Sequence, residues 1–102
     1  MNSINKFVWL PRFRRDYKKL TPQSQKRINQ ALLQMERDLK HPALETKKLK
    51  GTNSIWEARA SKNLRISFNL KGKLITLRTA GEHKILNRPQ DLSKYFVIQP
   101  FV

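Results

Sequence analysis

The hydrophobic pattern of this 102-residue chain changes its period once, and this change limits the possible folds more than any other feature. Between residues 22 and 41, apolar side chains recur every three or four positions, which is the spacing of one face of an α-helix. Over residues 55–61, 64–70 and 73–79, apolar and polar side chains alternate, as they do in β-strands. A chain whose helices precede its strands in this way packs the two as layers of an α+β domain.

Local signals predict a short strand and two helices in the first half of the chain. Residues 7–9 form the strand, and residues 12–20 form a short basic helix. Thr21 and Pro22 are residue types favoured at the N-cap and the first position of a helix, so the longer helix begins there. We expect it to end at His41, a structural residue that precedes a proline. Its apolar face carries Ile28, Ala31, Leu32, Met35 and Leu39.

The second half predicts a meander of three antiparallel strands, with turns at Asn63 and Gly72. The short N-terminal strand is a candidate fourth strand. The helices should cover the sheet face that carries Leu64, Ile66, Phe68 and Leu70. Arg59 and Arg65 then lie on the uncovered face, on neighbouring strands. We therefore predict one domain over residues 1–102, in which two N-terminal helices pack on one face of a small antiparallel sheet.

Charge narrows the choice of partners. The chain has 22 Lys and Arg residues against 7 Asp and Glu residues, a net charge of +15. The basic residues run from Lys6 to Arg88, so the folded surface as a whole is basic. A surface of this kind favours a polyanion, which is nucleic acid, an acidic protein or an anionic membrane.

Two residue patterns that the chain lacks exclude cysteine-dependent sites and membrane-spanning segments. Without cysteine, the chain has no disulfide, zinc-thiolate site or cysteine nucleophile. No stretch approaches the roughly 20 apolar residues that span a bilayer, so we expect a cytoplasmic protein with no membrane partner.

Three local patterns follow one another in the second half of the chain. Lys48-Leu49-Lys50-Gly51 precedes the segment 55–59, Arg65 lies in the next predicted strand, and the segment 80–86 contains His83. In their order and spacing these patterns resemble the RelE/ParE superfamily of toxins, over roughly residues 5–89. Arg65 lies in a strand similar to the arginine-bearing strand of that family, and the segment 80–86 looks like the family's segment after the last strand.

The resemblance implies a toxin of a type II toxin–antitoxin system. Members of the RelE branch enter the ribosomal 30S A site and cut mRNA, whereas members of the ParE branch inhibit DNA gyrase without nuclease activity. In both branches an acidic or amphipathic antitoxin neutralises the toxin. We therefore expect a free monomer that forms a hetero-oligomer with its antitoxin, and we favour the RelE-like endoribonuclease. The ParE-like inhibitor and a nucleic-acid-binding module without toxicity remain alternatives.

The resemblance also implies site residues. Cleavage of RNA without a metal needs deprotonation of the 2′-hydroxyl, stabilisation of the phosphorane charge and protonation of the 5′-oxygen. Arg65 and Arg59 are the predicted phosphate-stabilising residues, and His83 is the predicted proton-transfer residue because imidazole exchanges a proton near neutral pH. The predicted RNA-binding residues are Lys48, Lys50, Lys62 and Lys84. We predict no metal site and no cofactor.

Two departures from the active RelE pattern bear on these roles. Glu57 occupies a place where active members carry lysine, so this carboxylate would either act as a base or weaken RNA binding. Lys84 replaces an aspartate of the family segment. An aromatic side chain that stacks on a base would have to come from elsewhere, and Tyr95 and Phe96 are the candidates.

Overall fold

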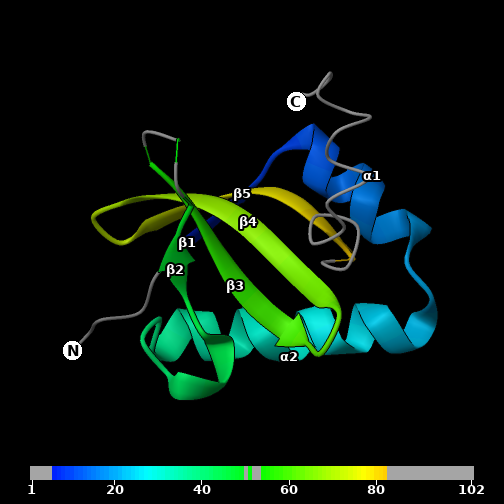
Figure 1. Cartoon of the computed structure of the whole chain (residues 1–102). Coiled ribbons are helices and arrows are strands. Elements are labelled where there is room, and N and C mark those ends of the chain that lie inside the picture. The colour runs from blue at the N-terminus through cyan, green and yellow to red at the C-terminus, as the bar shows by residue number, and fades with distance from the viewer. Residues whose placement is uncertain (1–5, 50, 52–53, 83–102) are drawn as a thin grey trace.

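The computed structural model describes residues 6–49, 51 and 54–82, which form two α-helices, one 3₁₀ turn and five strands (Figure 1). In chain order these elements are β1 (Lys6–Trp9), α1 (Pro11–Lys19), α2 (Pro22–Arg37), η1 (Pro42–Leu44), β2 (Lys47–Lys48), β3 (Ile55–Ser61), β4 (Leu64–Lys71) and β5 (Leu74–Glu82). The predicted α+β class is confirmed.

The strands form one sheet in the order β1-β5-β4-β3-β2. The predicted meander is present, since β3, β4 and β5 pair antiparallel, and Gly72 has a φ of 60° in the turn between β4 and β5. The sheet is nevertheless mixed, because β1 joins β5 in parallel. A purely antiparallel sheet was therefore the wrong prediction. No hairpin sets the direction of β1, since both helices lie between it and its partner in the chain.

The start of α2 follows the sequence signal. The side-chain oxygen of Thr21 accepts a hydrogen bond from the backbone N–H of Ser24 at 3.1 Å, and Pro22 takes the first helical position. This bond satisfies one of the backbone donors that the first helical turn leaves without a partner.

The end of α2 differs from the prediction, because the helix stops at Arg37 rather than at His41. Asp38 has extended backbone angles, and its side chain accepts a hydrogen bond from the backbone N–H of Lys40 at 3.0 Å. Such a local bond competes with the helical ladder. His41 begins the next turn, where its Nδ1 accepts from the N–H of Ala43 at 3.1 Å, so its structural role is confirmed.

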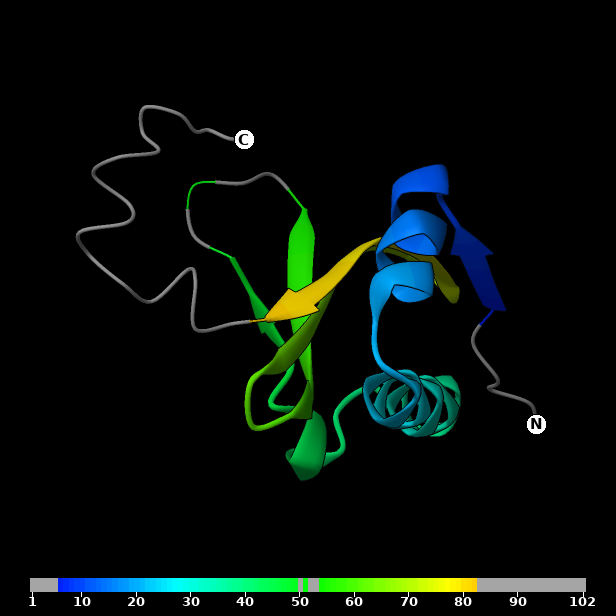
Figure 2. The same ribbon diagram turned by 90° about the vertical axis from the view of Figure 1, so that its right-hand side faces the viewer.

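Both helices contribute to a single core on one face of the sheet (Figure 2). The buried face predicted from the alternation in β4 is confirmed, because Leu64, Ile66 and Phe68 are buried. The largest fully buried side chains are Phe13, Ile28, Met35, Ile66, Phe68, Ile75 and Leu77. Among the described residues, no helix covers the opposite face of β3, β4 and the end of β5, and we call it the open face.

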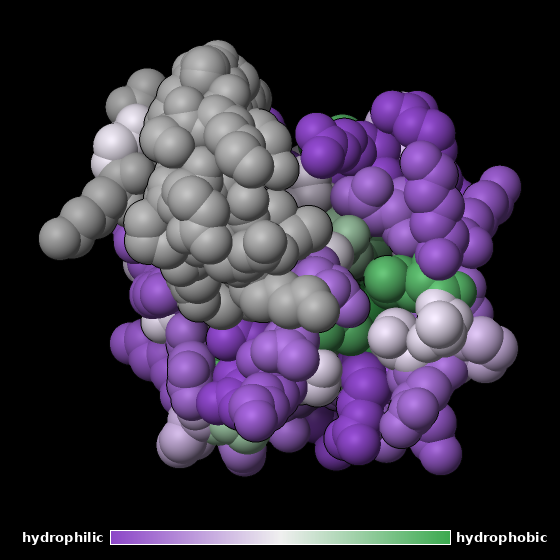
Figure 3. Space-filling view, turned by 45° about the vertical axis from the view of Figure 1, so that its right-hand side comes forward, coloured by the Kyte–Doolittle hydropathy of each residue, from purple (hydrophilic) through white to green (hydrophobic). Residues whose placement is uncertain are grey.

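Trp9 joins the core at its margin. Its ring packs edge-on against those of Phe13 and Tyr17, with centroids 4.8 Å and 5.3 Å away. The surface displayed in Figure 3 is mainly hydrophilic around a small apolar patch, as a chain of this charge requires.

Candidate functional site

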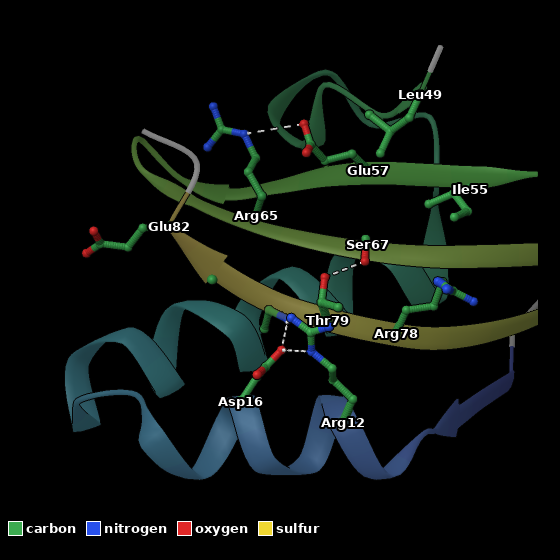
Figure 4. A pocket seen from close by; sticks show the side chains of 12 residues that line it. Arg12, Asp16, Leu49, Ile55, Glu57, Arg65, Ser67, Arg78, Thr79 and Glu82 are labelled. Atoms are coloured by element: carbon green, nitrogen blue, oxygen red, sulfur yellow. Dashed lines mark hydrogen bonds and ion pairs between the residues drawn. The ribbon is translucent and has the colours of Figure 1, made fainter. Parts of the chain in front are cut away.

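The open face is hollowed into a cleft of about 420 Å³ (Figure 4). Its floor is formed by side chains of β3, β4 and β5, and α1 stands along one side. The lining residues are Arg12, Asp16, Leu49, Ile55, Glu57, Arg65, Ser67, Arg78, Thr79, Ala80, Gly81 and Glu82. We call this hollow the open-face cleft.

The α1 side of the cleft exists because β1 is short. Strand β1 pairs with β5 only as far as Leu77, and no other strand of the described segments pairs with the rest of that edge of β5. There Asp16 of α1 accepts a hydrogen bond from the backbone N–H of Ala80 at 3.1 Å. Asp16 also lies 3.8 Å from the Nε of Arg12, so the contact that covers the strand edge places an arginine at the rim.

Arg65 lies on the open face, as predicted, with its Cα opposite Gly81 of β5. Its Nη1 donates to three backbone oxygens around the β3–β4 turn, those of Ser61 (2.8 Å), Lys62 (3.1 Å) and Leu64 (3.3 Å). These bonds fix the plane of the guanidinium. In the described part of the chain, no partner is seen for Nη2, which is therefore the nitrogen available to a ligand.

Glu57 faces Arg65 across the floor, and its side chain is only 6% exposed. Its Oε1 lies 3.9 Å from the Nε of Arg65 and 4.0 Å from the Nζ of Lys47. A carboxylate in this position offsets part of the positive charge of both neighbours. The departure noted in the sequence therefore lies inside the cleft, next to the principal candidate arginine.

The other predicted residues that the structure describes lie outside this cleft. Arg59 is opposite Arg65 in the β3–β4 register and shares its face, but its Nη1 binds the Oε2 of Glu45 at 2.7 Å. Lys48 is opposite Trp56, whose ring packs against the core, so Lys48 belongs to the other face of the sheet. Lys62 lines a second hollow of about 440 Å³ beside the start of α2. The predictions for Lys50, His83, Lys84, Tyr95 and Phe96 fall outside the described residues.

Sequence reasoning missed several cleft residues. Arg78 donates from its Nη1 to the Oδ1 of Asn69 at 3.0 Å, and a hydroxyl pair, Ser67 with Thr79, lies on the floor between Arg78 and Arg65 (Figure 4). The polar positions of β4 were visible in its alternation. The alternation in β5 likewise places Arg78 among the polar positions of that strand.

Among the described residues, no three His, Cys, Asp or Glu side chains are grouped as a metal ion would require. None of the helices in the described part is long and apolar enough to cross a bilayer.

The similarity of this chain to known proteins is seen in its structure and not in its sequence. No protein-family model and no curated protein matches the sequence. A chain of the E. coli DinJ-YafQ toxin-antitoxin complex superposes with a TM-score of 0.67 at 13% identity, over 80% of this chain and 96% of that one.

Three further chains superpose almost as well. A copper-bound mutant toxin from Helicobacter pylori gives a TM-score of 0.66 at 20% identity, over 81% of this chain and 99% of that one. A chain of the RelB-RelE antitoxin-toxin complex from Methanococcus jannaschii gives 0.64 at 22% identity, over 78% and 94%. A YoeB/ParE toxin from Agrobacterium tumefaciens matches with a TM-score of 0.64 at 19% identity, over 76% and 98%. The fold of this chain is that of the RelE/ParE toxins.

Proposed function

We propose that this chain is the toxin of a toxin–antitoxin pair and that it cleaves RNA in the open-face cleft. The observation that carries the proposal is the position of Arg65, on the open face and away from the helices, with Nη2 available in a hollow that a polynucleotide can enter. The net charge of +15 supports a polyanionic substrate. The fold supports the toxin class through its likeness to YafQ and RelE.

Arg65 is the proposed phosphate-stabilising residue. A phosphate bound through Nη2 keeps the three carbonyl bonds of Nη1 and the 3.9 Å contact between Nε and Glu57. A guanidinium that is already oriented loses little freedom when it binds a phosphate oxygen. It can therefore stabilise the additional charge of the phosphorane without rearrangement of the cleft floor.

His83 is the proposed proton-transfer residue, and it follows the cleft-lining Glu82 in the sequence. In the proposed step, the 2′-oxygen loses its proton to a base and attacks the phosphorus, and the bond to the 5′-oxygen breaks. Imidazolium supplies the proton that the departing 5′-oxygen needs. The products are a 2′,3′-cyclic phosphate and a 5′-hydroxyl. Glu57 is the described carboxylate nearest to Arg65 and is the candidate base.

We assign the substrate and partners from the RelE-like resemblance. The substrate is mRNA in the 30S A site, and the chain acts in the cytoplasm. Arg59 and the lysines at 50, 62 and 84 hold RNA near the cleft, whereas Lys48 would contact RNA from the other face of the sheet. The inhibiting partner is an acidic antitoxin, because its charge complements the basic toxin.

The test is induction of the wild-type chain in cells, with transcript ends mapped across the transcriptome. We expect growth arrest with new mRNA ends at codon-related positions, and loss of both in Arg65→Ala. Arg37→Ala removes the same charge from the last turn of α2 and should leave the activity unchanged. Undiminished arrest in the double variant Arg65→Ala, His83→Ala would rule out this chemistry. Intact mRNA together with inhibited supercoiling would instead identify a gyrase inhibitor.

A further inference from the structure

The open-face cleft contains a second oriented arginine, Arg78, which lies at a β-bulge. The pairing of β4 with β5 shifts between Ser67 and Phe68, whose partners are Thr79 and Leu77, so Arg78 is an extra residue in β5. Its two neighbours on β5 belong to opposite faces, because Leu77 is buried in the core and Thr79 lines the cleft. Bulges redirect side chains in this way and are frequent beside functional sites.

The partner of Arg78 distinguishes it from the other two arginines that line the cleft. Arg12 lies 3.8 Å from Asp16, and Arg65 lies 3.9 Å from Glu57. Arg78 binds the neutral amide oxygen of Asn69, and no ion pair joins it to another residue in the described part of the chain. Its full positive charge is therefore available to an anion in the cleft.

Asn69 is itself held in place. Its Nδ2 donates to the backbone oxygen of Ser54 at 2.9 Å and lies 3.3 Å from the Oγ of the same residue. The amide is thereby fixed so that its oxygen points at Arg78. This chain of hydrogen bonds orients the guanidinium before any ligand arrives, which lowers the entropic cost of binding.

The two arginines lie apart along the cleft (Figure 4). Arg65 and Asn69, the partner of Arg78, are four residues apart on β4, which corresponds to about 13 Å along a strand. The hydroxyls of Ser67 and Thr79 lie between them. Two cations at this separation, with hydroxyl groups between them, match an extended ribonucleotide strand longer than one nucleotide.

We propose that Arg78 is a positioning residue that binds a phosphate of the RNA more than one nucleotide away from the scissile phosphate, which is held by Arg65. This inference rests on the proposed function, because it takes RNA as the ligand. It adds the path of the bound RNA, which runs along β4 from Arg65 past Ser67 to Arg78.

The experiment measures binding of a fluorescein-labelled single-stranded RNA whose riboses are 2′-O-methylated, so that it cannot be cut, over a range of salt concentrations. Arg78→Ala should weaken binding about tenfold, as expected for one charge-assisted hydrogen bond. It should also reduce the slope of log K against log salt by about 0.7, the contribution of one phosphate contact on a single strand. Arg78→Lys should retain the slope, and the matched control Arg37→Ala should resemble the wild type.

A second variant keeps the inference testable if Arg78→Ala does not fold. Asn69→Asp is nearly isosteric and places a carboxylate 3.0 Å from the guanidinium, so it should weaken RNA binding as Arg78→Ala does. It carries the test if melting curves show that Arg78→Ala is unfolded.

The outcomes separate this inference from the nuclease proposal. A wild type that cuts RNA, with Arg78→Ala and Asn69→Asp indistinguishable from Arg37→Ala in affinity and salt slope, overturns the role of Arg78 alone. A wild type that binds RNA through Arg78 but cuts no unmodified RNA on ribosomes overturns the nuclease and leaves the inference standing. A wild type that binds no RNA overturns both.

Discussion

Replacing Glu57 with glutamine should tighten the binding of RNA. The carboxylate is almost fully buried in the cleft floor, 3.9 Å from the Nε of Arg65. A phosphate on the far side of that guanidinium would stand about 7 Å from the carboxylate. Two like unit charges at that distance repel by about 0.6 to about 2.4 kcal/mol as the effective dielectric constant falls from about 80 to about 20. Removing the charge should therefore raise the affinity roughly 3-fold to 50-fold.

The assay is fluorescence anisotropy with the same uncleavable RNA, at low salt because screening reduces the effect. Glu36→Gln is the matched control, since it removes a carboxylate from α2 and changes the net charge equally. Cleavage of unmodified RNA is measured in parallel. If Glu57 is also the base, Glu57→Gln will bind more tightly and cut more slowly. A folded Glu57→Gln protein whose affinity is no higher than that of Glu36→Gln would refute the placement of the phosphate at Arg65.

Three predictions concern the fold. Thr21→Ala removes the acceptor of the Ser24 N–H and should lower the free energy of unfolding by about 1 kcal/mol in urea titrations, with a variant equal to the wild type arguing against the cap. Phe68→Ala empties a fully buried position and should cost about 3–5 kcal/mol, a large part of the stability of a small domain. Asp16→Ala leaves the Ala80 N–H at the β5 edge without its acceptor, so hydrogen exchange at that amide should accelerate, and unchanged protection would contradict the contact.

The layered fold could be predicted from the sequence because its signals are local. The alternation in β4 identified the buried positions Ile66 and Phe68, and Thr21 identified the start of α2. The parallel pairing of β1 with β5 could not be predicted, since it depends on how the two helices return the chain to the sheet. The end of α2 was missed because one side-chain bond of Asp38 outweighed a regular apolar pattern.

The candidate site was only partly predictable, for reasons of register. Arg65 was placed on the open face by the period of its strand. Lys47, rather than Lys48, faces Glu57, and this difference of one residue is set by the pairing of β2 with β3. Arg12 reaches the cleft only because β1 ends early and α1 takes its place beside β5. The positions of Lys47 and Arg12 depend on contacts between distant segments, which a single sequence does not specify.

The chemistry of the RNA ends tests the central claim most directly. Purified wild-type chain is added to ribosomes that carry a defined mRNA, and the ends of the fragments are identified. Attack by the 2′-oxygen at a phosphate held by Arg65 predicts a 2′,3′-cyclic phosphate on one fragment and a 5′-hydroxyl on the other, with no cleavage where the ribose at the cut site is 2′-deoxy. Fragments that carry a 3′-hydroxyl and a 5′-phosphate, or cutting that continues at the 2′-deoxy site, would contradict the account.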